Sequence, residues 1–265
     1  MSAKRTSKQT SRSVRRVLVT RATEQAPDLT QALHKLGFEP VVVPTIEIVA
    51  PPSFDELDQA IAELDQIDYL ILTSVNSVTA FFDRLTALGL DVNALAKLQT
   101  VAVGPKSAEA ITARGVKADL VPEDYRAEGV VALLKERVSG KRLLYPKAAL
   151  ARDLITAELT AVGAEVIAPV AYASAVPADA AENLRMALVD GLDLLTFTAS
   201  STVQNFVDLL SAENLRLAKQ IPVASIGPLT SATAEKLGFT VVIEPDNATL
   251  DDMVEAIEKY ASGTE

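Results

Sequence analysis

The sequence contains no cysteine, no tryptophan and a single histidine, His34. Without cysteine the chain has no disulfides, no thiolate metal ligands and no cysteine nucleophile. His34 lies off the apolar stripe of its expected helix, which includes Leu29 and Leu33, and this favours a surface position over a catalytic one. Redox chemistry, thiol catalysis and a Ser-His-Asp triad are therefore without support.

Long apolar runs and basic patches are also missing. No run approaches the roughly 20 residues of a membrane helix, and residues 1–13 are basic and hydroxyl-rich without the apolar core of a signal peptide. We expect a disordered tail over 1–13 and a cytoplasmic protein. The net charge of −10 argues against nucleic-acid binding, and the acidic pairs 123–124 and 251–252 lack the spacing of metal ligands. No glycine-rich phosphate loop follows an expected strand, so the expected partner is a small molecule other than a nucleotide.

The chain contains an internal repeat of sequence segments. Four segments recur in the same order and at nearly constant spacing: 16–21 as 142–147, 41–44 as 166–169, 72–78 as 197–203, and 101–105 as 223–228. Such long-period similarity predicts two units of the same build, with a ligand site between them.

The apolar pattern predicts an α/β fold. Strands are expected near 17–20, 40–48, 69–73, 100–103, 118–121, 142–145, 165–173, 193–198, 222–226 and 240–243, and helical stripes separate nearly all of them. This alternation predicts two doubly wound parallel sheets, each covered on both faces. The long runs 41–49 and 166–172 each contain a proline, which suits a strand that leaves a sheet, so we expect the chain to cross between domains there.

In doubly wound sheets ligands bind in the loops that follow the carboxyl ends of the strands. These loops are rich in hydroxyls and small residues, and their helices begin with unpaired amides. Helix capping and anion binding both explain such residues, and their recurrence in both copies favours a ligand. The candidates are Ser74, Asn76, Gly104, Ser107, Thr198, Ser200, Ser201, Gly227 and Thr230.

Three further side chains are candidates. Arg21 and Lys147 directly follow equivalent strands, and each fits either a ligand carboxylate or a solvated strand end. Tyr172, at the end of a crossing strand, fits either a proton donor or a packed hinge residue.

Together these motifs resemble the uroporphyrinogen-III synthase family, the cyclases of tetrapyrrole biosynthesis. The resemblance covers residues 14–260 and rests on segments 72–78, 101–108, 169–172, 195–198 and 226–232. It implies two similar flavodoxin-like α/β domains joined by a two-stranded connector. One domain would combine 14–43 with 174–265, and the other would be 44–173.

The resemblance also implies the chemistry. Hydroxymethylbilane loses its hydroxyl and closes with ring D inverted through a spiro intermediate, without a cofactor or a metal. Tyr172 would assist hydroxyl loss; Thr198, Ser200, Ser201 and Thr230 would bind substrate from one domain, and Ser74, Asn76, Gly104 and Ser107 from the other. Ala199 replaces the family's usual serine, which argues against a catalytic hydroxyl at that position. The enzyme would be a monomer that receives its substrate from the preceding deaminase, without nucleic acid or membrane.

Two other functions fit the pattern less well. A non-catalytic two-lobed receptor for an anionic metabolite would explain a cleft without a clear catalytic group. A nucleotide-sugar transferase would explain two doubly wound domains, but the loops show no donor site. Turnover of the bilane separates the cyclase from both.

Overall fold

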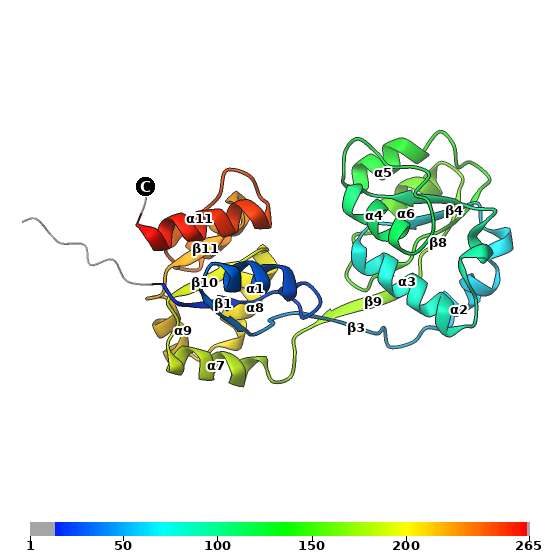
Figure 1. The fold of residues 1–265 in the computed structure, drawn as a ribbon. Helices are drawn as coiled ribbons and strands as arrows, with labels where there is room; N and C mark the ends of the chain where they lie inside the picture. Colours follow the sequence, from blue (N-terminus) through cyan, green and yellow to red (C-terminus); the bar gives the residue numbers. More distant parts are fainter. Residues whose placement is uncertain (1–13, 264–265) are drawn as a thin grey trace, which may run out of the picture. The chain divides into compact units, whose positions relative to one another are not determined.

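The computed structural model describes residues 14–263, so the predicted tail over 1–13 lies outside the described residues. The chain divides into two compact units, each built around its own parallel sheet (Figure 1). Unit 1 combines the chain up to Glu47 with the chain from Ala175 onward, and unit 2 is Ile48–Ser174.

Unit 1 has a five-stranded sheet in the order β12-β11-β10-β1-β2, and its paired strands are parallel. The strands are β1 (Arg16–Val19), β2 (Glu39–Val42), β10 (Leu194–Phe197), β11 (Val223–Ser225) and β12 (Val241–Ile243). One face packs on α7 (Ala180–Asp190), α8 (Ser200–Leu209), α9 (Ala212–Ala218) and α10 (Pro228–Lys236). The other face packs on α1 (Ala26–Lys35) and α11 (Leu250–Ser262). Because successive strand residues point to opposite faces, Leu18 joins the first of these cores while Val17 and Val19 join the second.

Unit 2 repeats this arrangement with the strand order β5-β4-β6-β8, also parallel. The strands are β4 (Tyr69–Leu72), β5 (Gln99–Ala102), β6 (Arg142–Leu144) and β8 (Glu165–Ile167). One face packs on α2 (Asp55–Ala62), α3 (Val75–Ala87), α4 (Pro105–Ala113) and the 3-10 turns η1 (Leu64–Gln66) and η2 (Val92–Leu95). The other packs on α5 (Ala127–Leu134) and α6 (Leu154–Ala161). The sequence repeat matches each strand of unit 2 to a strand of unit 1: β4 to β10, β5 to β11, β6 to β1 and β8 to β2. The matched strands have the same order in both sheets, so the two units share one topology.

Three strand predictions need correction. The expected strand over 118–121 is only a single bridge between Leu120 and Val101. The runs 40–48 and 165–173 are not continuous, because the first is interrupted around Pro44 and the second around Pro169, and proline has no N–H for a ladder. Beyond these breaks, β3 (Glu47–Val49), β9 (Val170–Ala175) and β7 (Lys147–Ala148) form a separate three-stranded sheet in the order β3-β9-β7. The chain passes from one unit to the other within β3 and β9, and the connector has a short third strand that was not predicted.

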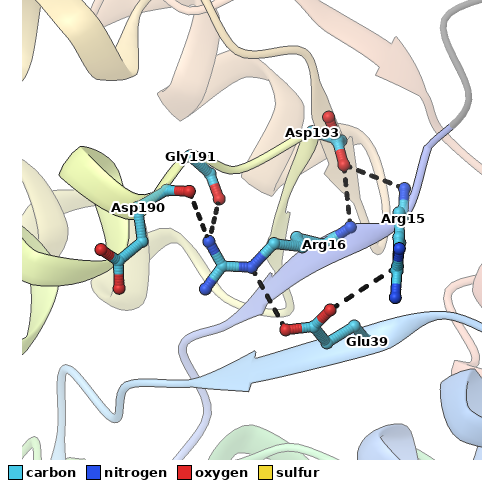
Figure 2. Close-up of polar contacts among 6 residues, drawn as sticks. All are labelled: Arg15, Arg16, Glu39, Asp190, Gly191 and Asp193. Carbon is cyan, nitrogen blue, oxygen red and sulfur yellow. Dashed lines mark hydrogen bonds and ion pairs between the residues drawn. The ribbon is translucent and has the colours of Figure 1, made fainter.

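A polar clasp closes the amino edge of the unit 1 sheet (Figure 2). The Asp193 carboxylate accepts the backbone N–H of Arg16 at 2.9 Å. The Arg16 guanidinium donates to the carbonyls of Asp190 and Gly191, both at 2.7 Å, and its Nε lies 3.4 Å from the Glu39 carboxylate. These bonds join β1 and β2 to the turn before β10, which comes from the other end of the chain. The clasp therefore stabilises a unit built from two distant segments.

Unit 2 contains the same clasp, with Asp68, Arg142 and Glu165 in the places of Asp193, Arg16 and Glu39. The Asp68 carboxylate accepts the backbone N–H of Arg142 at 2.9 Å, and the Arg142 Nε donates to Glu165 at 3.0 Å. Lys141 adds a third contact, with its Nζ 2.9 Å from Asp68. In both units the charged groups at the amino edge are thus paired with one another.

We expect Asp68→Ala to lower the free energy of unfolding of unit 2 by about 1 kcal/mol at pH 7, because two donors lose their acceptor. The hydrogen bond from Lys141, followed by that from the Arg142 backbone, holds the pKa of Asp68 below its usual value. A lowered carboxyl pKa stabilises the fold above about pH 4, and this contribution is lost as the pH falls through the folded-state pKa. The difference between variant and wild type should therefore shrink in acid.

Urea denaturation at pH 7 and pH 3, with hydrogen exchange of β4 and β6 amides, measures this effect. Asp65→Ala is the control, since Asp65 is an exposed carboxylate of the same unit. An equal loss of stability for both variants at pH 7 would contradict the role of the clasp.

Candidate functional site

Four hydroxyl-bearing residues belong to the carboxyl edge of unit 2, Thr73, Ser74, Tyr145 and Tyr172, and two of their hydroxyls are in contact. The Tyr172 Oη lies 2.9 Å from the Ser74 Oγ. Thr73 and Ser74 end β4, Tyr145 follows β6 directly, and Tyr172 lies on β9. Tyr172 is 9% exposed and packs against the core that contains α3. The ring of Tyr172 is thus packed and its hydroxyl has a polar partner, while its role as a proton donor stays a prediction.

Ser74 is held rigidly at the start of α3. Its Oγ accepts the backbone N–H of Ser77 at 3.0 Å, and the Ser77 Oγ accepts the N–H of Ser74 at 3.0 Å, which forms a capping box. Ser74 therefore caps the helix and contacts Tyr172 with the same hydroxyl. Asn76 is half-buried in the first turn of the helix.

The glycine loops before α4 and α10 are alike. Gly104 and Gly227 are the N-cap residues of these helices, and each is followed by proline, so neither helix has a capping side chain at its start. A Cβ on Gly104 would lie 3.1 Å from Tyr125, and one on Gly227 would lie 3.2 Å from Ala248. The adjoining loops thus crowd a Cβ at both glycines. In the first turn of α10 the Thr230 N–H donates to the Gly227 carbonyl at 3.0 Å, and no side chain caps either helix.

The hydroxyls predicted near these glycines lie deeper than expected. Ser107 is 4% exposed and Thr230 is 5% exposed, and they occupy equivalent positions in the first turns of α4 and α10. Both side chains are therefore buried and do not lie on an open surface.

The hydroxyl residues of the loop before α8 differ in their contacts and exposure. Ser200 donates to the carbonyl of Leu229 at 3.1 Å and accepts from Thr233 at 3.0 Å, which ties α8 to α10. Ser201 is exposed, and Thr198 is half-buried at the end of β10. Ala199 is the N-cap residue and makes no side-chain hydrogen bond, so the first amides of α8 lack a capping side chain.

The two basic candidates differ. Lys147 is paired with Asp153 at 2.6 Å, and its side chain is 16% exposed. Arg21 has two buried nitrogens, Nε and Nη1, without a hydrogen-bond partner, and its Nη2 reaches only Gln25 at 3.4 Å. Burial lowers the pKa of Arg21, with Asp28 acting in the opposite direction. Buried donors without acceptors are costly, so Arg21 is suited to a carboxylate from a ligand.

Sequence analysis did not single out Tyr145, which directly follows β6 and is 4% exposed. Its burial depends on the order of strands in the sheet, with β6 between β4 and β8. Within residues 14–263 no group of three or more His, Asp or Glu side chains is placed to hold a metal ion. In the same range no helix is long and apolar enough to cross a bilayer.

Fold and loops together define a two-unit, doubly wound α/β protein with hydroxyl, amide and guanidinium donors at the carboxyl edges of its sheets. Residues 13–255 match the family model of uroporphyrinogen-III synthase HemD. A uroporphyrinogen-III synthase of Synechococcus elongatus is 37% identical over 94% of this chain and 96% of its own length. A putative uroporphyrinogen-III synthase of Methanothermobacter thermautotrophicus is 32% identical over 90% and 96%.

Solved structures show the same fold. A mutant uroporphyrinogen III synthase from the extremely thermophilic bacterium Thermus thermophilus is 21% identical, with a TM-score of 0.62 over 94% of this chain and 100% of that one. The enzyme from Helicobacter pylori is 18% identical, with a TM-score of 0.58 over 91% and 97%. The chain belongs to the uroporphyrinogen-III synthase family. It is accordingly a cyclising lyase of porphyrin biosynthesis.

Proposed function

We propose that this chain converts hydroxymethylbilane to uroporphyrinogen III, with loss of water and inversion of ring D through a spiro intermediate. Family membership supports the reaction. The observation that carries the mechanism is the contact between Tyr172 and Ser74 at 2.9 Å, which sets a phenol beside the start of a helix. Neither the described residues nor the comparisons support a non-catalytic receptor.

Loss of the hydroxyl requires a proton at the leaving oxygen. In our mechanism the C–O bond breaks, the oxygen takes the phenolic proton of Tyr172 and leaves as water. The Ser74 hydroxyl then donates to the phenolate oxygen, and the positive end of the α3 dipole stabilises the same charge. The methylene carbon that carried the hydroxyl then bonds to the substituted carbon of ring D, and the proton released when the rearranged ring regains aromaticity restores the phenol. Ring closure with inversion depends on how the loops hold the chain.

We assign substrate binding to the loops at the carboxyl edge of each unit. Unit 1 would contribute Arg21, Thr198, Ser200, Ser201, Gly227 and Thr230, and unit 2 would contribute Ser74, Asn76, Gly104, Ser107 and Lys147. The bilane is rich in carboxylates while the protein carries a net charge of −10, so the substrate needs local donors. The unpartnered nitrogens of Arg21 and the uncapped amides of α4, α8 and α10 supply them.

We further propose that the protein works as a cytoplasmic monomer supplied by the preceding deaminase, with 14–43 plus 174–265 and 44–173 as its functional domains. The bilane closes spontaneously to the uninverted isomer, so direct transfer between the enzymes would protect the substrate. Co-sedimentation of the two proteins during turnover would test this transfer.

Turnover of hydroxymethylbilane tests the proposed function. With purified protein we expect the type III isomer to form faster than spontaneous closure produces type I, and chromatography of the oxidised porphyrins resolves the two. Formation of type I alone, at the rate seen without protein, would refute the proposal.

We expect Arg21→Met to raise KM roughly 10-fold with a smaller change in kcat, because a charge-assisted hydrogen bond to a substrate carboxylate is lost. Arg185→Met is the matched control, since Arg185 is exposed on α7 and paired with Glu182. Lys147→Met should have a weaker effect than Arg21→Met, because Asp153 already neutralises Lys147. Steady-state kinetics would contradict the assignment if Arg21→Met and Arg185→Met behaved alike.

A further inference from the structure

Three hydrogen-bonded side chains join β11, α10 and the end of β12 at the carboxyl edge of unit 1. The Ser231 hydroxyl, in the first turn of α10, donates to the carboxylate of Glu244, which directly follows β12. The Ser225 hydroxyl, at the end of β11, lies 2.5 Å from the same Ser231 oxygen. Ser225 and Ser231 are buried, whereas Glu244 is exposed. We call these three residues the polar chain.

The carboxylate at one end of the polar chain sets the order of its donors. A carboxylate only accepts hydrogen bonds, and a serine hydroxyl has one proton to donate. Because Ser231 gives its proton to Glu244, Ser225 has to donate to Ser231. The Gly227 carbonyl, 3.4 Å from the Ser225 Oγ, is then a weaker second acceptor. Ser231 thus accepts one bond and donates another, and this fixes its side chain and the turn that carries it.

Unit 2 has apolar side chains at the positions of the polar chain. In unit 2 Val101 bridges Leu120. The residues at the repeat positions of unit 1, Ala224 and Ile243, are also paired, so the equivalence holds in the structure as well as in the sequence. In this register the members of the polar chain correspond to small or aliphatic residues: Ala102, Ala108 and Val121.

The helix turn itself forms in both units. The N–H of Ser231 donates to the carbonyl of Gly227 at 3.0 Å, and Ala108 makes the same bond to Gly104 at 3.0 Å. Alanine at this position is therefore compatible with the turn, and the hydroxyl of Ser231 is not needed to form it.

The two glycine loops differ in the residue that covers them. In unit 2 the Tyr125 side chain lies 3.1 Å from the Cβ position of Gly104. In unit 1 the residue over Gly227 is Ala248, whose methyl group lies 3.2 Å from the corresponding position. An aromatic ring makes many more contacts than a methyl group, so it holds a loop by packing. Unit 1 lacks that ring, and the polar chain supplies directed bonds at the start of α10 in its place.

We propose that the polar chain consists of positioning residues for the cyclisation, which fix the first turn of α10 so that the adjacent Thr230 hydroxyl keeps the orientation that binds the bilane. This inference rests on the proposed function, in which Thr230 contacts the substrate. Thr230 is buried, and its N–H shares the Gly227 carbonyl with the N–H of Ser231, so a shift of one residue moves the other. The polar chain then affects activity through Thr230, because small displacements of a binding group lower the rate.

The test replaces members of the polar chain with their unit 2 counterparts in the full-length chain. We expect Ser231→Ala and Glu244→Val each to lower kcat/KM for hydroxymethylbilane roughly 10-fold, since both break the same hydrogen bond. Glu244→Gln keeps an acceptor for the Ser231 hydroxyl and should retain wild-type activity. Asp246→Val is the matched control, because it removes an exposed carboxylate from the same loop and should leave kcat/KM unchanged.

A double variant with Thr230→Ala separates positioning from general stability. If the polar chain acts through Thr230, Thr230→Ala with Ser231→Ala should be no slower than Thr230→Ala alone. Three results would each overturn the inference: a further loss of roughly 10-fold in the double variant, equal losses in Glu244→Gln and Glu244→Val, or equal losses in Asp246→Val and Glu244→Val. Wild-type protein without bilane turnover would refute the proposed function and this inference with it, whereas an active wild type matched by Ser231→Ala would refute the inference alone.

Discussion

Replacing Tyr172 with phenylalanine should lower the kcat for hydroxymethylbilane by about 100-fold while KM changes little, because removal of a positioned general acid typically costs that much or more. The substitution deletes one oxygen from a residue that is 9% exposed and packed against the α3 core, so the fold should persist. The lost atom is the one that lies 2.9 Å from Ser74. Its loss therefore acts on proton transfer rather than on packing.

Isomer analysis makes this experiment specific. Spontaneous closure yields the uninverted ring, so the slower Tyr172→Phe enzyme should release a larger share of type I product from the same bilane. Thr230→Ala is the comparison variant, because a substrate-binding hydroxyl in the first turn of α10 should affect both KM and kcat. Equal kcat for wild type and Tyr172→Phe would remove the proton-donor assignment.

The sheet architecture was largely predictable because it depends on short-range patterns. Each central strand is a run of buried apolar residues, such as Leu70–Leu72 in β4, and each sits between helical stripes. The repeat then predicted that both units share one topology, and their strand orders agree. The strand boundaries near Pro44 and Pro169 were harder to predict from the sequence. Proline indicates that the chain leaves the sheet, but it does not indicate where the next strand begins.

The sequence predicted which loops are rich in polar and small residues, but it did not predict the contacts of each residue. Sequence placed Gly104 and Gly227 at strand ends, yet only the neighbouring loops show that a Cβ would be crowded there. Arg21 and Lys147 are equivalent in the repeat, and only the structure shows that one is paired with Asp153 while the other has buried nitrogens without partners. Contacts of this kind depend on residues far apart along the chain, which a local pattern cannot specify.

A second large effect is expected in the core of unit 1, where Phe206→Ala should lower the free energy of unfolding by about 3–5 kcal/mol. Phe206 is 0% exposed, with its ring 5.3 Å from that of Phe197 and 6.0 Å from that of Phe239. Truncation removes one of three mutually contacting rings and leaves a cavity between α8 and the sheet. A loss of this size is a large fraction of the stability of an ordinary domain.

The sequence repeat supplies a matched experiment. Phe81 occupies the place of Phe206 in unit 2, is also 0% exposed, and stacks edge-on against Phe82 at 5.4 Å. Hydrogen exchange should show protection lost in β10 and β11 for Phe206→Ala, and in β4 and β5 for Phe81→Ala, because each core belongs to one unit. Val189→Ala, at a 65% exposed position on α7, should leave both patterns intact. If either phenylalanine variant lost protection evenly across both sheets, the two cores would form a single cooperative body, and the repeat would be one of topology without independent stability.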